Sequence, residues 1–315
     1  MPPKSYKRLY QSLPAGFIES MAEQYGPREL DAILDGFMCK RPATLRVNAL
    51  KADVREVMEA FRKQGVKHER AQWYADALII RNKRERDLEQ NELYTDGRVY
   101  LQSLSSMIPP LVMQPKPGWR VLDLTAAPGS KTTQIAALMG NEGYILANEL
   151  NQIRGERLKF NIARQGAFIA EVRIGDGKRL EPDLAASFDA VLLDAPCSGV
   201  GLFSADSPVT FRAWSPRNVG SLVKEQRSLL RTAAWALRPG GILIYSTCTL
   251  TSEENEQNVA WALSKLGEVA VLMQEPVDLE ITGAGVSTIR RDGCLLVLPS
   301  ELYEGFFVAK MRKRA

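Results

Sequence analysis

Residues that build metal sites, disulfide frameworks and histidine-centred active sites are scarce in this sequence. Its 315 residues contain 4 cysteines, at positions 39, 197, 248 and 294, and a single histidine, His68. No two cysteines form a CxxC pair, which disfavours a zinc site. A catalytic triad built on histidine would have to use His68. Four scattered cysteines fit a reducing compartment better than a disulfide-bonded secreted protein.

Long apolar segments are also missing. No run approaches the roughly 18 residues that cross a bilayer, and the N-terminal segment 1–14 lacks the apolar core of a secretory signal. We therefore expect no membrane span, no bound metal and a cytoplasmic location. With 45% hydrophobic and 25% charged residues the composition is that of a folded protein, and the length suggests two domains.

Charge of one sign is not in large excess, since 41 Lys and Arg face 37 Asp and Glu for a formal net charge of +4. The basic residues nevertheless gather in clusters, which are Lys4 with Lys7 and Arg8, segment 81–86, segment 154–164 and the tail 310–315. Such clusters can bind phosphate backbones, but charge runs are also common on solvated faces. Charge alone leaves both interpretations open.

The hydrophobic pattern divides the chain into two parts. Residues 1–105 predict a smaller α+β domain, in which an amphipathic helix within 52–65 is flanked by extended segments at 44–48 and 77–80. Residues 106–315 predict an α/β domain whose apolar strands alternate with helices that begin near Ser130, Gln152, Asn218 and Glu253. The predicted strands are 121–125, 143–150, 170–175, 188–196, 240–248 and a last one at 305–311.

Continuous apolar strands between helices are typical of a parallel, doubly wound sheet, which binds ligands at the carboxyl ends of its strands. We expect the last strand to close that sheet. All polar motifs described below follow predicted strands directly.

A turn of small residues follows the first predicted strand of the second part, in the segment 123–136, DLTAAPGSKTTQIA. Ala126, Ala127 and Gly129 let the backbone approach a ligand closely, and free N–H groups at a helix start suit a carboxylate or phosphate. Lys131 could add a charged hydrogen bond to an anionic group. The P-loop pattern is not met, because a serine separates the glycine from Lys131 and the first glycine is absent. A tight turn without a ligand is the alternative.

Acidic residues follow the next two predicted strands. Glu149 ends the second strand, where a ribose would need hydroxyl acceptors, and Asp176 ends the third, where it could accept from an adenine amino group. Each alone could be a loop or cap acid. Their position on consecutive strand ends favours a cofactor that contains adenosine.

Two cysteines lie in the segments after the fourth and fifth strands, Cys197 in DAPCSGVG (194–201) and Cys248 in YSTCTL (245–250). A single free cysteine is usually a buried filler. Two at one ligand-binding edge favour a nucleophile, because thiolates form readily near neutral pH. The residues alone do not say which of the two would attack. Cys39 and Cys294, in apolar contexts, are interpreted as structural.

AAPGSKT, DAPCSGVG and YSTCT, in this order and separation, resemble the RNA cytosine-C5 methyltransferases of the NOL1/NOP2/Sun family. The similarity extends to segments 41–48, 99–107 and 304–313, and the segment 134–150 looks most like the bacterial 16S rRNA methyltransferase F branch. The chain stops at Ala315, before a further RNA-binding region usual in that branch, and it has Pro299-Ser300 where Pro-His is common.

The resemblance implies a Rossmann-like class I methyltransferase domain and a smaller RNA-binding domain. It implies S-adenosylmethionine as the cofactor, held by Thr125, Ala126, Ala127, Pro128, Gly129, Ser130, Lys131, Glu149, Asp176 and Asp194. In the family mechanism the cysteine matching Cys248 attacks cytosine C6, the one matching Cys197 assists elimination, and Asp194 contacts the base.

RNA is the partner that the resemblance implies, rRNA before tRNA. The core motifs do not separate these two substrates. A catalytically idle RNA-binding assembly factor is the alternative of a different class. It would not need both cysteines, Asp194 and the complete cofactor turn together.

Overall fold

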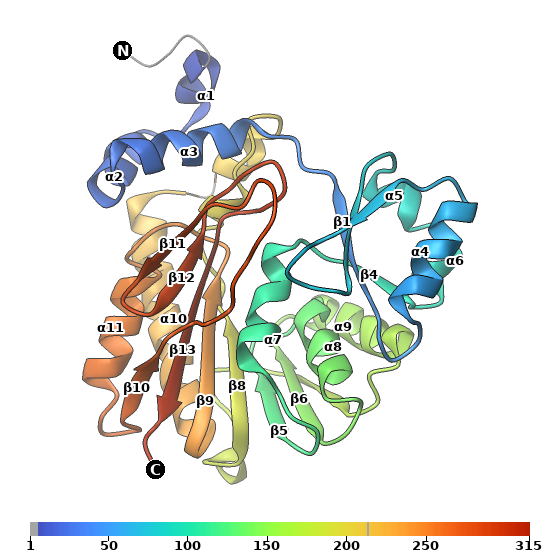
Figure 1. Cartoon of the computed structure of the whole chain (residues 1–315). Helices are drawn as coiled ribbons and strands as arrows, with labels where there is room; N and C mark the ends of the chain where they lie inside the picture. The colour runs from blue at the N-terminus through green and yellow to red at the C-terminus, as the bar shows by residue number, and fades with distance from the viewer. Residues whose placement is uncertain (1–5, 213) are drawn as a thin grey trace.

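Two bodies make up the computed structural model, which describes residues 6–212 and 214–315 and is shown in Figure 1. Lys4, of the first basic cluster, lies outside these residues. A small body carries a four-stranded sheet, at the right of Figure 1, and a large body carries a nine-stranded sheet. The C-terminus lies on the large body.

The small body is an antiparallel sheet covered by helices. Its strands run in the order β2-β3-β1-β4 and have the bounds β1 (Ala43–Val47), β2 (His68–Arg70), β3 (Ala77–Ile80) and β4 (Val99–Leu101). Its helices are α4 (Val54–Lys63), α5 (Glu85–Leu88) and α6 (Glu92–Thr95). Asp53 caps α4 by accepting from the Arg55 N–H at 2.7 Å, and Val57 and Phe61 of α4 are buried in this body's core. The predicted helix and both predicted strands are confirmed.

The large body is built on a mixed sheet in the order β11-β12-β13-β9-β8-β5-β6-β7, with β10 also paired to β13. The strands are β5 (Arg120–Asp123), β6 (Tyr144–Glu149), β7 (Ala170–Ile174), β8 (Phe188–Asp194), β9 (Leu237–Thr247), β10 (Leu272–Glu275), β11 (Thr288–Arg291), β12 (Cys294–Val297) and β13 (Phe306–Lys313). From β9 to β7 all neighbours are parallel, as predicted.

The last strand does not close the sheet, which corrects the sequence prediction. β13 lies inside, antiparallel to β9 on one edge and to β12 and β10 on the other. Its neighbouring side chains explain this position, because Phe307 is buried in the core on one face and Val308 in the core on the other. A strand buried on both faces belongs in the interior of a sheet.

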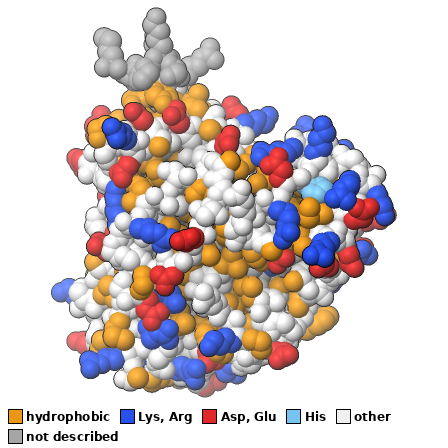
Figure 2. All heavy atoms as spheres, in the orientation of Figure 1, with side chains coloured by type: hydrophobic (Ala, Val, Ile, Leu, Met, Phe, Trp, Pro, Cys, Tyr) orange, Lys and Arg blue, Asp and Glu red, His pale blue; other side chains and the backbone are white. Residues whose placement is uncertain are grey.

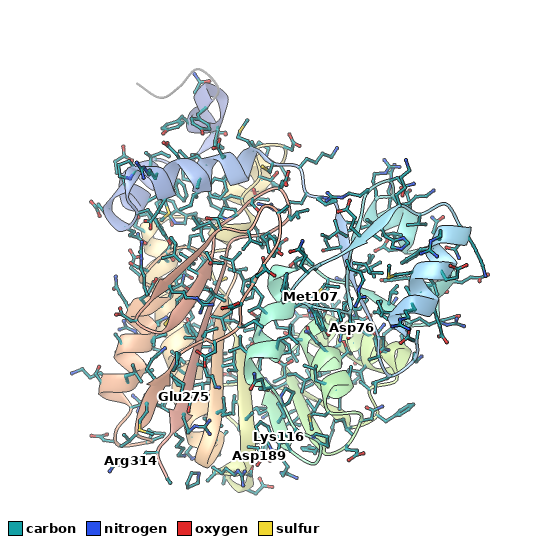
Figure 3. The ribbon with its side chains drawn as sticks, viewed as in Figure 1. Asp76, Met107, Lys116, Asp189, Glu275 and Arg314 are labelled. Atoms are coloured by element: carbon teal, nitrogen blue, oxygen red, sulfur yellow. The ribbon has the colours of Figure 1, made fainter. Side chains whose placement is uncertain are left out.

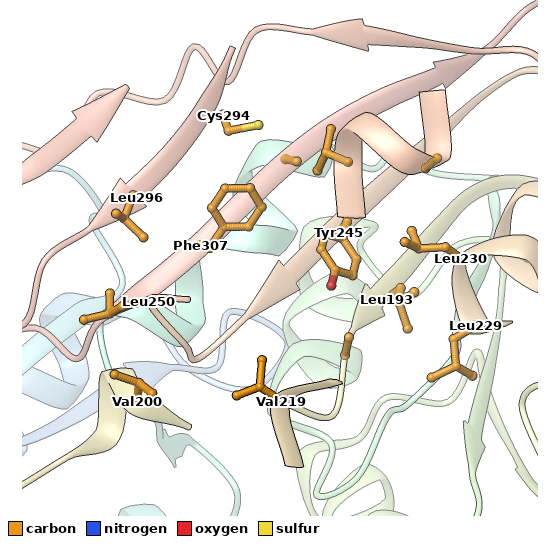
Figure 4. Packing of buried hydrophobic residues seen from close by; sticks show 14 of the residues in the cluster. Leu193, Val200, Val219, Leu229, Leu230, Tyr245, Leu250, Cys294, Leu296 and Phe307 are labelled. Carbon is orange, nitrogen blue, oxygen red and sulfur yellow. The ribbon is translucent and has the colours of Figure 1, made fainter. Parts of the chain in front are cut away.

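Helices cover both faces of the large sheet. One face carries α7 (Ile108–Met113), α8 (Ser130–Leu138) and α9 (Gln152–Gln165), and the other carries α10 (Pro216–Ala236) and α11 (Glu256–Lys265). On the α10 face Leu193, Leu229 and Tyr245 lie in one core (Figure 4). This two-sided covering is the doubly wound arrangement that the sequence predicts.

The N-terminal helices α1 (Lys7–Ser12), α2 (Phe17–Gln24) and α3 (Pro27–Met38) pack on the large body. The rings of Phe17 and Phe37 lie 5.3 and 5.4 Å from that of Phe203, measured between centroids. The small sheet therefore begins only at β1. The predicted domain boundary near residue 105, between β4 and α7, stays a prediction.

A buried polar contact joins the two bodies. Arg46 of β1 is 1% exposed, and its guanidinium donates to Gln102 Oε1 at 3.1 Å and to Thr133 Oγ1 of α8 at 3.0 Å. Gln102 in turn donates to Gln134 Oε1 at 3.0 Å. Figure 3 shows side chains, Met107 among them, filling the space between the bodies. Arg46 Nη1 has no hydrogen-bond partner among the described residues, but the bonds of the other two guanidinium nitrogens favour one orientation of the bodies.

The described residues contain neither a candidate membrane span nor a candidate metal site. None of the helices there is long and apolar enough to cross a membrane. Nor does that part of the chain contain a group of three or more His, Cys, Asp or Glu side chains placed to hold a metal ion.

Candidate active site

The carboxyl ends of the parallel strands bring the predicted motifs together. Cys197, three residues after β8, and Cys248, directly after β9, lie with their sulfurs 3.2 Å apart. The Thr125 hydroxyl, after β5, donates to the carbonyl oxygen of Asp194 at 2.8 Å. Parallel neighbours end at the same sheet edge, so residues distant in sequence meet there.

A cavity of about 300 Å³ lies at this edge. Of the predicted cofactor residues, the cavity is lined by Thr125, Ala127, Glu149, Asp176 and Asp194, and both Cys197 and Cys248 reach it. Ala126, Pro128, Gly129, Ser130 and Lys131 are not among the lining residues. Contacts of those five with a cofactor stay a prediction.

The turn before α8 needs its glycine. Gly129 has φ +105°, and a Cβ there would lie 2.9 Å from Leu158 Cδ1 of α9. Only glycine adopts this conformation without strain. The close packing of the turn on α9 holds Ala127 at the cavity wall, where its carbonyl accepts from Arg154 at 2.8 Å.

The two acidic residues after β6 and β7 are both partly engaged. Glu149 is 3% exposed, and its Oε1 accepts from the Asn151 N–H at 2.9 Å. Arg154 Nη1 lies 3.5 Å from the other oxygen of Glu149. Asp176 Oδ1 accepts from the Lys178 N–H at 3.0 Å. The remaining carboxylate oxygen of each can accept from a ligand hydroxyl or amine.

Asp194 and Lys131 form an ion pair beside the cysteines. Lys131 Nζ lies 2.7 Å from Asp194 Oδ2 and donates to Ser106 Oγ at 2.8 Å, while Ser246 donates to Asp194 Oδ1 at 2.7 Å. Lys131 therefore neutralises a carboxylate of the protein. The sequence indicated neither this pairing nor the roles of Ser106 and Ser246, although all three residues lie within motifs that it singled out.

A second, larger cleft of about 780 Å³ meets the same edge from the other side of Asp194 and Cys248. Its walls come from both bodies and are formed by Tyr94 and Tyr100 of the small body, Arg157, Phe160 and Arg164 of α9, and Lys131. Asp194 and Cys248 line both cavities, whereas Cys197 lines only the smaller of the two.

Burial changes the acidity of two groups near this edge. Burial raises the pKa of Asp123 to about 7, although a hydrogen bond from Thr132 stabilises the ionised form and lowers the pKa. The hydrogen bond to Cys248 raises the pKa of the Cys197 thiol well above its usual value, helped by burial and by the negative charges of Cys248 and Glu254. Burial is thus the main cause for Asp123, whereas for Cys197 it comes second to the hydrogen bond with Cys248.

The other cysteines and His68 lie elsewhere. Cys294 is buried in β12, and Cys39 is half-buried at the end of α3. His68 lies in β2, with Nδ1 2.9 Å from the Val66 carbonyl oxygen. None of the three lines either cavity.

The basic clusters differ in how free their charges are. On the face shown in Figure 2, Lys and Arg side chains gather over the small body, with acidic ones among them. In the 81–86 segment Arg81 pairs with an acidic neighbour at 2.8 Å. The tail cluster is largely used within β13, where Lys310 and Arg312 pair with Glu275 (labelled in Figure 3). The tail is therefore a poor candidate for binding phosphates.

Known families and relatives match most of this chain. A family model described as 16S rRNA methyltransferase RsmB/F matches residues 110–312, and one described as a ferredoxin-like domain of RsmF/B-like methyltransferases matches residues 13–86. The ribosomal RNA small subunit methyltransferase F of Serratia proteamaculans is 40% identical over 310 residues, which is 96% of this chain and 63% of that protein. The methyltransferase F of Klebsiella pneumoniae is 40% identical over 290 residues, which is 88% of this chain and 59% of that protein. The chain thus spans less than two thirds of these relatives.

Solved structures show the same fold. A methyltransferase homolog from Pyrococcus horikoshii has a TM-score of 0.82 at 27% identity, covering 99% of this chain and all of that one, 100%. NSun6 from the same organism, solved with SFG, has a TM-score of 0.84 at 24% identity. The match covers 96% of this chain and 99% of that one.

These matches confirm the predicted Rossmann-like methyltransferase fold with its smaller N-terminal α+β part. Fold and family are those of methyltransferases that use S-adenosylmethionine, the predicted cofactor. The predicted resemblance to the methyltransferase F branch is confirmed as well. By the match over most of its large body, this chain belongs to the family of 16S rRNA methyltransferases RsmB/F.

Proposed function

We propose that this chain transfers a methyl group from S-adenosylmethionine to C5 of a cytidine in RNA, with ribosomal RNA as the substrate. Cys248 adds to C6 of the base, which makes C5 nucleophilic, and Cys197 assists the elimination that releases the product. An aromatic pyrimidine carbon is too poor a nucleophile before such an adduct forms.

One observation carries this proposal: Cys248 and Asp194 line both cavities at the sheet edge. A methyl donor in the smaller cavity and a base in the larger cleft would meet at these two side chains. Placing two reactants at one point is the main way that an enzyme accelerates a transfer between them.

The smaller cavity suits an S-adenosylmethionine molecule, which supplies an electrophilic methyl group on a positively charged sulfur. The walls of this cavity carry the carboxylates of Glu149, Asp176 and Asp194. Its volume of about 300 Å³ is at the lower end for ligand pockets. Glu149 would accept from ribose hydroxyls and Asp176 from the adenine amino group, as hydrogen-bond acceptors.

The larger cleft separates the roles of the two cysteines. Cys248 reaches this cleft and the cofactor cavity, and Cys197 reaches only the latter. A nucleophile must touch the base, so Cys248 is the better candidate for the attack. Asp194, which bonds to Lys131 and Ser246, lines the cleft with Cys248 and would contact the base.

RNA suits the walls of the cleft. Phe160 is 63% exposed there, and the Arg164 guanidinium lies 4.0 Å from the ring centroid of Tyr94. Unstacked bases of single-stranded RNA stack on aromatic rings and guanidinium planes. A base must leave its helix to reach Cys248 at the inner end of such a cleft.

A path for the phosphate backbone continues from the cleft. A groove of about 810 Å³ runs between the bodies and is lined by Lys40, Arg41, Arg81, Lys83 and Arg84. Glu85, Ser103 and Glu304 line both the groove and the cleft, so the two are continuous. Basic side chains along a groove favour binding of a phosphate chain.

The test compares cysteine variants after incubation with small-subunit rRNA and S-adenosylmethionine, using denaturing gels and bisulfite sequencing. We expect Cys248→Ala to give neither methylation nor adduct, because it lacks the nucleophile. We expect Cys197→Ala to accumulate protein joined covalently to RNA, because attack and transfer proceed without release. Cys39→Ala, outside both cavities, is the matched control and should behave as wild type.

Other outcomes have defined meanings. An adduct with Cys248→Ala but not with Cys197→Ala would reverse the two roles. Full activity of both variants would refute the covalent mechanism. If only tRNA is methylated, the substrate assignment is wrong while the chemistry stands. An unmodified RNA that still binds tightly would favour an idle assembly factor.

A further inference from the structure

Behind the two cysteines, on the side away from the cleft, lies a buried carboxylate that no motif of the sequence indicated. Glu254 is completely buried, at 0% exposure. Its Oε1 accepts from the Ser198 N–H and from Gln226 Nε2, both at 2.9 Å. Its Oε2 accepts from the hydroxyls of Ser198 and Thr251, at 2.5 and 2.6 Å. Four donors aimed at two oxygens suit an ionised carboxylate, which can only accept.

Two of these partners, Ser198 and Thr251, belong to the segments that carry the cysteines, and Gln226 belongs to α10. Ser198 directly follows Cys197, and Thr251 lies three residues after Cys248. The Ser198 hydroxyl also lies 2.8 Å from that of Thr249. Glu254 therefore ties the segment after β8 to the segment after β9, and this tie helps to set the 3.2 Å separation of the sulfurs.

The bonds of the carboxylate come nearer to Cys197 than to Cys248 along the chain. Glu254 accepts from the backbone N–H and the hydroxyl of Ser198, the residue next to Cys197, whereas its contact in the other segment is Thr251, three residues after Cys248. Lys131 and Asp194 instead line the cleft with Cys248. A negative charge close to one of two thiols disfavours the thiolate there.

We propose that Glu254 is a positioning residue that holds both cysteine segments together and keeps the proton shared by the two sulfurs on Cys197, so that Cys248 carries the thiolate. This inference rests on the proposed function for its purpose, since it selects the nucleophile. The raised pKa of the Cys197 thiol, to which Glu254 contributes, agrees with it.

The other titratable and charged groups around Cys197 do not oppose this assignment. They are Cys248, which shares the proton, Tyr245 of β9, and the groups that line the same cavity, which are Glu149, Arg154, Asp176, Asp194 and Glu225. Burial raises the pKa of Tyr245 far above its usual value, so that phenol stays neutral. Each of the four cavity carboxylates lies within 4.0 Å of a cation, which is Lys131, Arg154 or Lys178, and this cation offsets its charge.

The Glu254→Gln variant removes the charge and can keep the bonds. Its carbonyl can replace Oε1 and accept from Ser198 N–H and Gln226. Its amide group can replace Oε2 and donate to the hydroxyls of Ser198 and Thr251, because a hydroxyl both donates and accepts. Glu253→Gln is the control, since it removes the same charge one residue away, on a side chain that lines a different cavity.

The experiment measures alkylation of each cysteine by iodoacetamide from about pH 6 to about pH 12 in the full chain, without RNA or cofactor, by mass spectrometry of peptides, because the Cys197 midpoint lies above the usual range of a thiol. The midpoint in pH reports ionisation independently of how exposed each sulfur is. In the wild type, Cys248 should react at a lower pH than Cys197. Glu254→Gln should lower the Cys197 midpoint by about one pH unit or more, and Glu253→Gln should leave both midpoints in place.

Two results would overturn the proposal. One is a wild type in which Cys197 reacts at the lower pH, and the other is a folded Glu254→Gln variant with an unchanged Cys197 midpoint. If that variant does not fold, Glu254→Asp decides, because it keeps the charge: Cys197 must still react at the higher pH, and equal midpoints contradict the proposal. Failure of the wild type to methylate RNA would instead count against the proposed function and would not alter these midpoints.

Discussion

Replacing Asp123 by asparagine should remove a large part of the pH dependence of stability. Asp123, at the end of β5, is 1% exposed and accepts one hydrogen bond from Thr132 at 2.7 Å. Burial raises its pKa from 3.8 to about 7. One pH unit corresponds to about 1.4 kcal/mol, so full ionisation in the folded state costs up to about 4 kcal/mol.

The sign follows from proton binding. The unfolded carboxyl ionises near pH 3.8 and the folded one near pH 7, so the folded state holds the extra proton between these values. The free energy of unfolding therefore falls as pH rises from about 4 to 7 and then levels off. Asparagine has no such proton, and its oxygen can still accept from Thr132. The variant should gain stability relative to wild type as pH rises.

The assay is urea unfolding at pH 5, 6, 7 and 8, followed by circular dichroism. The exposed Asp183→Asn is the control, since it removes a carboxylate that is not buried. The difference in unfolding free energy between Asp123→Asn and wild type should grow over this range by a few kcal/mol. A difference that stays constant from pH 5 to pH 8 would refute the reasoning.

Three further predictions concern binding. Glu149→Ala and Asp176→Ala should each weaken S-adenosylmethionine binding by about 1–3 kcal/mol in calorimetry, because each removes an acceptor; unchanged affinity in both would remove the nucleoside assignment. Alanine at the four basic residues of segment 81–86 should make the salt dependence of RNA affinity shallower, since fewer counterions are released; an equal slope would mean a solvated face. Phe160→Ala should weaken RNA binding by about 1–3 kcal/mol, the range for lost base stacking, with cofactor affinity unchanged; equal RNA affinity would remove the stacking role.

The parallel half of the large sheet could be predicted from the sequence because its strands are continuous apolar runs between helices. β8 and β9 were located in this way, and their ends carry Cys197 and Cys248. The antiparallel extension was harder to foresee. β13 pairs with β9 although many residues separate them, and no local pattern reports which strand becomes the neighbour of another.

In the candidate site too, the sequence predicts what depends on neighbouring residues and not what depends on contacts between distant ones. Motif residues were found because they are contiguous and follow strands. Lys131 was assigned to the cofactor because it begins a helix beside small residues, whereas its ammonium bonds to Asp194 and Ser106, which are far from it in sequence. Glu254 and Arg46 were missed because a buried charge cannot be told from a surface charge until its partners are known.

A buried polar network links the small body to the helix that follows the proposed cofactor turn. Arg46 and Gln102 of the small body bond to Thr133 and Gln134 of α8, the helix that begins with the cofactor turn. A buried network of this kind resists shearing, because any displacement leaves polar groups unpaired. The wall that would hold the RNA is thus coupled to the turn that would hold the methyl donor. Under the proposed function, a base that enters the cleft between them would meet Cys248, which lines that cleft.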